Sequence, residues 1–172
     1  MNNNKLKLLV DSYKNFPQEG IVFRDVLPIL MNPDIFSDLI KEISSSDVLR
    51  NSDALIAIDA RGFIFGAAIA FNVSKPLVVA RKPGKLPGDL TSKSYLLEYG
   101  ENSLSIQKES LKNYNSYLIV DDLLATGGTV SCVAEIIKEQ KKEVTGLSVV
   151  VELAELNARE KLKFPVDSQL TL

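Results

Sequence analysis

The chain lacks histidine and has almost no cysteine. Its 172 residues contain no histidine and one cysteine, Cys132. The missing histidine removes the usual imidazole base and the usual zinc ligand, so any acid or base chemistry must use carboxylate, tyrosine, lysine or backbone groups. The lone thiol permits no disulfide within the chain.

Long apolar runs and an excess of positive charge are also missing. The longest apolar run, residues 63–71, is interrupted by Gly66 and falls well short of the roughly 20 residues that span a bilayer. The amino end, residues 1–5, has no continuous apolar segment, so no secretory signal is evident. The 20 Lys and Arg against 22 Asp and Glu leave a net charge of −2 and no global positive field to hold a nucleic acid. We therefore expect a cytoplasmic protein that binds neither a membrane nor a nucleic acid.

Length and composition favour a single domain over residues 1–172. With 45% hydrophobic and 24% charged residues, the chain lies within the globular range. The apolar runs at 55–58, 77–80 and 117–120 show no polar alternation, which is typical of parallel strands that are covered on both faces.

Helical patterns connect these strands. Residues 129–142 carry apolar side chains at helical spacing and lead into a fourth predicted strand at 147–151, and residues 61–72 connect the first two strands. The alternation predicts an α/β fold, in which a central, mostly parallel sheet is flanked by helices. Ligands of such sheets bind beyond the carboxyl ends of the strands.

Two regions depart from the alternation. Residues 83–102 are rich in Pro, Gly, Ser and Thr and have no convincing helical or strand period, so they predict a long loop of the kind that is usually functional. Residues 16–28 place Pro17 and Gly20 before a short apolar run and predict an extended segment laid onto the main domain.

The segment 117–129 is the most informative. A buried strand leads into Asp121-Asp122, and then into a small-residue stretch, 125–129, at the start of a helix. Small residues let backbone N–H groups turn inward, and the helix N-terminus adds partial positive charge, so this stretch can cradle a phosphate. Carboxylates accept paired hydrogen bonds from vicinal hydroxyls. Together they predict a seat for a ribose 5-phosphate.

The alternative is a solvated strand end followed by an ordinary turn. The strand, acid pair, glycine pair and helix stand in the order that a phosphate site requires, which favours the functional interpretation. No Gly-Lys-Ser/Thr and no Gly-x-Gly-x-x-Gly occur, so the two commonest nucleotide-binding loops are excluded.

Residues 120–129 resemble the phosphoribosyl pyrophosphate (PRPP) signature of type I phosphoribosyltransferases, in the form found in members that act on adenine. Further ordered matches lie at 16–17, 20–25, 59–63, 81–88, 95–100 and 159–162. The resemblance implies the type I phosphoribosyltransferase fold, with a flexible lid loop at 83–102 and an N-terminal base-pocket segment at 1–30. It implies purine salvage, in which the 5-phosphoribosyl group passes from PRPP to N9 of adenine and gives AMP and pyrophosphate.

The resemblance also implies a pyrophosphate site and a lid residue. The turn at Ala60 and Arg61 would hold pyrophosphate, often through a strained non-proline peptide, although many relatives carry a hydroxyl residue where Ala60 stands. Lys82 and Lys85 would neutralise the leaving group; without the resemblance, these cations fit a solvated surface equally well. Glu98 would handle the proton at the purine, with the lid excluding water as it closes.

The base pocket is expected on the N-terminal segment. An extended backbone at 22–24 offers N–H and C=O groups that complement N1 and N6 of adenine, whereas a 6-oxopurine reverses the polarity at position 6. The resemblance implies that Phe23 stacks on one face of the purine and that Leu123 and Leu153 pack against the other.

The candidate catalytic residues are therefore Glu98 and Arg61. The candidate substrate-binding residues are Val22, Phe23, Arg24, Ala60, Arg61, Lys82, Lys85, Tyr99, Asp121, Asp122, Leu123, Ala125, Thr126, Gly127, Gly128, Thr129 and Leu153. No protein metal ligand is predicted, because Mg²⁺ would be bound mainly through PRPP. The resemblance implies a homodimer. Two alternatives stay open: a noncatalytic sensor of PRPP, and the same reaction with hypoxanthine or guanine.

Overall fold

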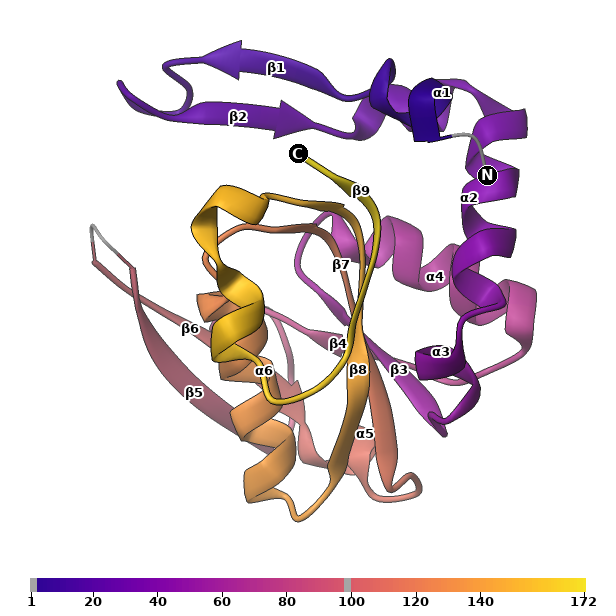
Figure 1. The fold of residues 1–172 in the computed structure, drawn as a ribbon. Helices are drawn as coiled ribbons and strands as arrows, with labels where there is room; N and C mark the ends of the chain where they lie inside the picture. The colour runs from indigo at the N-terminus through magenta and orange to yellow at the C-terminus, as the bar shows by residue number, and fades with distance from the viewer. Residues whose placement is uncertain (1–2, 98–99) are drawn as a thin grey trace.

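The computed structural model describes residues 3–97 and 100–172 and has a five-stranded parallel sheet at its centre (Figure 1). The strand order is β4-β3-β7-β8-β9, and every neighbouring pair runs parallel. The predicted α/β fold with a central parallel sheet is confirmed. The strands are β3 (Ala54–Ile58), β4 (Leu77–Ala80), β7 (Ser116–Leu124), β8 (Glu143–Glu152) and β9 (Val166–Thr171).

Helices cover both faces of the sheet. Alternate strand residues point to opposite sides, so strands with continuous apolar runs present an apolar surface on each face. Ile56 joins the core under α6, and Leu55 joins the core under α2 and α4. None of the described helices is long and apolar enough to cross a bilayer. The helices are α1 (Asn3–Lys7), α2 (Pro33–Ser44), α3 (Asp47–Arg50), α4 (Gly62–Val73), α5 (Lys108–Leu111) and α6 (Gly128–Glu139), with 3₁₀ turns η1 (Leu27–Met31), η2 (Ala154–Leu156) and η3 (Ala158–Lys161).

The four predicted strands and both predicted helices are present, with shifted ends. Strand β7 continues past residue 120 to Leu124, so the acid pair lies within the strand rather than after it. Strand β9 was not predicted. It lies at the edge of the sheet, where polar residues are tolerated, and its sequence DSQ between Val166 and Leu170 hides the strand signal.

The predicted loop at 83–102 is wrong over most of its second half. Strands β5 (Leu90–Leu97) and β6 (Gly100–Gln107) form an antiparallel hairpin instead. Two of its buried positions carry small polar residues, Thr91 and Ser105, and the Ser105 hydroxyl oxygen lies 2.7 Å from that of exposed Ser92. Strands whose buried positions hold threonine or serine do not show an apolar and polar alternation, so the sequence does not reveal their period.

The predicted extended segment at 16–28 is confirmed only over residues 22–25, because residues 17–20 turn and Leu27 begins η1. Strands β1 (Asp11–Lys14) and β2 (Val22–Asp25) pair antiparallel and form a separate hairpin. Figure 1 shows this hairpin lying across the end of the molecule at which the parallel strands have their carboxyl ends. The fold thus brings residues from the two ends of the chain to one edge of the sheet.

Candidate functional site

A pocket of about 400 Å³ opens at the carboxyl ends of β3 and β7. It gathers eleven of the predicted site residues, which are Ala60, Arg61, Lys82, Asp121, Asp122, Leu123, Ala125, Thr126, Gly127, Gly128 and Thr129. Its wall also includes Asp59, Tyr95 and Asn102, to which sequence reasoning gave no role. The turn after β3 and the loop after β7 meet here because the carboxyl ends of parallel strands share one edge.

Residues 125–129, which we call the phosphate loop, connect β7 to α6. Gly127 adopts φ +81° and ψ 0°, a left-handed conformation that glycine reaches without strain. Helix α6 begins at Gly128, and the first N–H groups of a helix have no acceptor within it. The loop therefore presents backbone donors and the positive end of the α6 dipole to the pocket.

Tyr95, on β5, closes one side of the phosphate loop. Its ring carbon Cδ2 lies 3.5 Å from the position that a Cβ at Gly128 would take. The Thr129 hydroxyl donates to the Tyr95 phenol oxygen at 3.2 Å. The hairpin thus contributes to the wall of the pocket, and only its pairing in three dimensions brings Tyr95 to this place.

The acid pair lies at the base of the pocket, on β7. Asp122 is only 4% exposed, and its backbone N–H donates to Oδ1 of Asp121 at 2.9 Å. Helix α4 begins directly against this strand. A Cβ on Gly62 would approach Asp121 Oδ1 to 2.9 Å and the Val120 carbonyl oxygen to 3.0 Å, so only glycine permits this close contact.

Burial sets the ionisation of both acids. Desolvation, and then the neighbouring negative charge of Asp122, raise the pKa of Asp121 well above its ordinary value. Desolvation also raises the pKa of Asp122, although the Arg61 guanidinium opposes this shift. A buried acid pair of this kind is costly when both members are ionised, and hydroxyl donors or a cation would stabilise it.

Arg61 connects the acid pair to the N-terminal hairpin. Its Nε lies 2.8 Å from Oδ2 of Asp122, an ion pair without hydrogen-bond geometry, since that oxygen has no hydrogen-bond partner among the described residues. Its guanidinium carbon lies 4.9 Å from the centre of the Phe23 ring, a cation–π distance. Phe23 in turn contacts Phe16 edge to face at 5.2 Å. One cation therefore contacts both the acid pair and the predicted base-stacking ring.

The turn before Arg61 contains a cis peptide bond between Asp59 and Ala60, one position before the turn at which the resemblance implied an unusual peptide. Asp59 Oδ2 accepts a hydrogen bond from Nε of Arg81 at 3.1 Å, so this arginine already has a partner. Lys82 lies at the pocket, whereas the side chain of Lys85 is exposed and outside its lining.

Several other predicted residues lie outside the pocket lining. Val22 is 42% exposed, and Arg24 Nη1 donates to the Ser12 hydroxyl at 2.5 Å. Leu153 follows β8, and its N–H donates to the Leu124 carbonyl at 2.9 Å. Glu98 and Tyr99 fall outside the described residues.

The carboxylate oxygens of the acid pair suit a hard cation that takes most of its ligands from the substrate rather than from the protein. Among residues 3–97 and 100–172, no group of three or more His, Cys, Asp or Glu side chains is placed to hold a metal ion. The two carboxylates of the acid pair are oxygen ligands of the type that Mg²⁺ prefers, and Mg²⁺ usually takes one or two carboxylates together with substrate phosphates.

Known proteins resemble the chain over nearly its whole length. Residues 29–169 match the phosphoribosyl transferase domain family. An adenine phosphoribosyltransferase of Prochlorococcus marinus (strain MIT 9515) is 62% identical, with 98% of each chain covered. The crystal structure of adenine phosphoribosyltransferase from Thermoanaerobacter pseudethanolicus is 35% identical, with a TM-score of 0.92, covering 99% of this chain and 100% of that one. The Saccharomyces cerevisiae enzyme, solved with adenine and an imino-altritol bisphosphate, is also 35% identical, with a TM-score of 0.89 and 98% of each chain covered.

Proposed function

The chain belongs to the phosphoribosyltransferase family, within its adenine phosphoribosyltransferase branch, and from this premise we propose how its pocket performs the transfer. The reaction takes adenine and PRPP to AMP and pyrophosphate. The bond from C1′ of the ribose to the pyrophosphate oxygen breaks, a bond from C1′ to N9 of adenine forms, and N9 loses its proton. One observation carries the proposal: a phosphate loop, a buried acid pair and Arg61 share one pocket.

The phosphate loop binds the 5-phosphate, and the acid pair binds the ribose hydroxyls. The inward N–H groups and the Thr126 and Thr129 hydroxyls supply donors for the phosphate. Asp121 and Asp122 accept from the two ribose hydroxyls, which stabilises carboxylates that burial otherwise penalises. The sugar is thereby fixed with C1′ facing the open part of the pocket, and this positioning lowers the barrier.

Arg61 and Lys82 bind the leaving pyrophosphate, and exposed Lys85 reaches it when the lid closes. To do so, Arg61 exchanges its ion pair with Asp122 for one with the incoming diphosphate. That exchange frees Asp122 for the ribose. Cations at a departing group stabilise the charge that develops there, which accelerates the chemical step. Mg²⁺, bound mainly through the oxygens of PRPP, would supply further charge neutralisation.

The free edge of β2 selects adenine. In the described part of the chain β2 pairs with β1 alone, so its other edge offers backbone N–H and C=O groups of Val22 and Arg24 to the base. An acceptor at N1 beside a donor at N6 fits such an edge, and a 6-oxopurine leaves buried groups unpaired. Phe23 stacks on the purine, with Leu123 and Leu153 opposite. Glu98, assisted by Tyr99, receives the N9 proton as the lid closes.

We further propose that the protein is a homodimer that uses the outer side of α4. Ile64, Ala67 and Phe71 recur at helical spacing on that side, and Phe71 is 89% exposed. An aromatic side chain this exposed is costly to leave in water, and a second copy of the same helix would cover it. A cytoplasmic location fits Cys132, which is a free and buried thiol.

The decisive experiment is a purine competition assay. Purified protein is incubated with PRPP and with adenine, hypoxanthine and guanine together, in the presence and absence of Mg²⁺. AMP is expected as the dominant product, and its formation should depend on Mg²⁺. IMP or GMP as the main product would overturn the choice of base. Binding of PRPP by calorimetry without a nucleotide product from any purine would replace the enzyme with a sensor.

A further inference from the structure

The 3₁₀ turn η3 lies against the phosphate loop on the side away from the pocket. Ala158 is buried, and its Cβ lies 3.4 Å from the position that a Cβ at Gly127 would take. Lys161 Nζ donates to the Thr126 carbonyl oxygen at 3.2 Å. Lys161 itself borders a groove beside α6 rather than the pocket, so it reaches the loop from behind. The turn therefore supports the loop both by packing and by a hydrogen bond.

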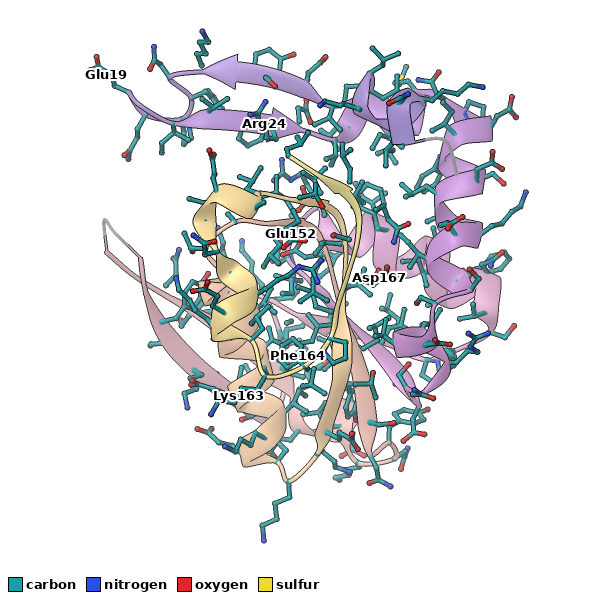
Figure 2. The ribbon with its side chains drawn as sticks, in the orientation of Figure 1. Glu19, Arg24, Glu152, Lys163, Phe164 and Asp167 are labelled. Atoms are coloured by element: carbon teal, nitrogen blue, oxygen red, sulfur yellow. The ribbon has the colours of Figure 1, made fainter. Side chains whose placement is uncertain are left out.

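The turn is itself fixed to the sheet. Arg159 donates from Nε and Nη2 to the two carboxylate oxygens of Glu152, at 2.6 Å each, and from Nη1 to the Val166 carbonyl at 2.8 Å. Glu152 is 5% exposed at the carboxyl end of β8 and also accepts from the Ser168 hydroxyl at 2.8 Å (Figure 2). Bidentate pairs of this kind fix geometry as well as charge. Lys161 therefore extends from a support tied to both β8 and β9.

The left-handed conformation of Gly127 depends on the orientation of the peptide bond that joins it to Thr126. Its φ of +81° and ψ of 0° are the values of the third residue in a type II turn. Type I and type II turns differ by a rotation of their central peptide, about 150° in one dihedral angle and about 170° in the next. The peptide that precedes Gly127 joins it to Thr126, and glycine permits both orientations of that peptide.

The Lys161 contact selects one of the two orientations. In a trans peptide the C=O and the following N–H point in opposite directions. Because Lys161 holds the Thr126 carbonyl on the outer side of the loop, the Gly127 N–H points to the inner side, where Gly127 lines the pocket. A rotated peptide would instead present a carbonyl oxygen to the phosphate and repel it.

We propose that Lys161 is a positioning residue that holds the Thr126–Gly127 peptide so that the Gly127 N–H faces the 5-phosphate. This role rests on the proposed function, since it requires the phosphate of PRPP or AMP to occupy the loop. Lys161 touches no substrate atom. Its effect is confined to affinity for the phosphoryl group, and binding of the base and the sugar is unchanged.

The test compares AMP with adenosine, which lacks the phosphate. Dissociation constants of both are measured by calorimetry for the wild type, Lys161→Met and Lys163→Met. Lys163 has the same charge two residues further on, and its side chain points away from the carboxyl edge of the sheet (Figure 2). Lys161→Met should weaken AMP binding about tenfold and leave adenosine binding unchanged, because a hydrogen bond from a charged group is lost. Lys163→Met should change neither, and Lys161→Arg should restore most of the AMP affinity.

Two further readouts separate positioning from a structural role. In ¹⁵N-labelled wild type, AMP should move the Gly127 amide proton resonance strongly, and Lys161→Met should reduce that shift. In steady state, Lys161→Met should raise the KM for PRPP and leave kcat and the KM for adenine unchanged. If Lys161→Met does not fold, Lys161→Gln removes the charge with a smaller change in polarity and is read in the same way.

Each failure has its own signature. An AMP-to-adenosine affinity ratio in Lys161→Met equal to that of the wild type would overturn the role of Lys161. A wild type that binds AMP no better than adenosine would instead overturn the phosphate seat on which the proposed function rests.

Discussion

The pocket and the predicted base segment, which lies outside its lining, are built differently. The acid pair lies on β7, and the phosphate loop connects β7 to α6; both elements pack into the core. The predicted base segment lies on the β1–β2 hairpin, where every residue of β1 is exposed and no strand of the central sheet pairs with it. The pocket is therefore built into the core, whereas the base segment lies on a hairpin with few buried residues. We expect any ordering of that segment on binding to reduce its net contribution to affinity.

The largest effect is expected from removing both negative charges of the acid pair. Asp121→Asn combined with Asp122→Asn should lower AMP formation about 10³-fold, because carboxylates that grip the ribose diol are replaced by amides in a desolvated site. Circular dichroism should stay native, since the substitutions are isosteric. Wild-type turnover in the double variant would show that the acid pair does not hold the sugar.

A smaller loss of activity, limited to one substrate, is expected from a substitution on the β1–β2 hairpin. Phe23→Ala should raise the KM for adenine about tenfold, the size of an aromatic stacking contribution, and leave the KM for PRPP unchanged. Steady-state kinetics with each substrate varied in turn would measure the split. Phe16→Ala removes the neighbouring ring and serves as the control, with a weaker effect expected. An equal rise for PRPP would mean that Phe23 acts through Arg61 and not through the base.

Tyr95→Phe tests how much the phosphate loop depends on the β5–β6 hairpin. The substitution keeps the ring against Gly128 and removes the acceptor of the Thr129 hydroxyl. The KM for PRPP should rise about threefold, which matches the loss of one neutral hydrogen bond. Thr129→Val should give at least the same rise, because it removes the hydroxyl itself. A normal KM in Tyr95→Phe would confine the role of this tyrosine to packing.

The last prediction concerns stability. Burial and the charge of Asp122 raise the folded-state pKa of Asp121 above its ordinary 3.8. At neutral pH this group therefore makes folding less favourable, because its ionised form is stabilised less in the folded protein than in the unfolded chain. Asp121→Asn removes that cost and should raise Tm by about 2–4 °C at pH 7.5, the shift that 1 kcal/mol produces in a domain of this size. The gain should fade as pH falls through the raised pKa, because protonation then relieves the wild type too. Thermal scans from pH 7.5 to 4 test this; a lower Tm for the variant at pH 7.5 would contradict it.

Such a gain in Tm would show that the charge of Asp121 lowers the stability of the folded protein. A substitution that abolishes activity and raises Tm indicates that the acid pair is kept for binding at the expense of stability. The same measurement on Phe23→Ala provides the contrast, since a partly buried ring on the hairpin carries no comparable electrostatic cost. Its Tm should fall slightly or stay unchanged.

The amino-acid sequence by itself determined the parallel core strands, because β-branched runs without polar alternation are typical of a sheet that is covered on both faces. It also predicted the phosphate loop, whose chemistry is local: strand, acids, small residues and helix follow one another within residues 117–129. The hairpin β5–β6 and the edge strand β9 escaped prediction, because serine and other polar residues occupy positions that pair or pack only in the folded chain. Tertiary structure alone decided which distant side chains meet: Arg61 with Asp122 and Phe23, Tyr95 with Thr129, and Lys161 with Thr126. These contacts join residues from separate elements, and their distances are set by how sheet, helices and hairpins pack, which no local pattern encodes.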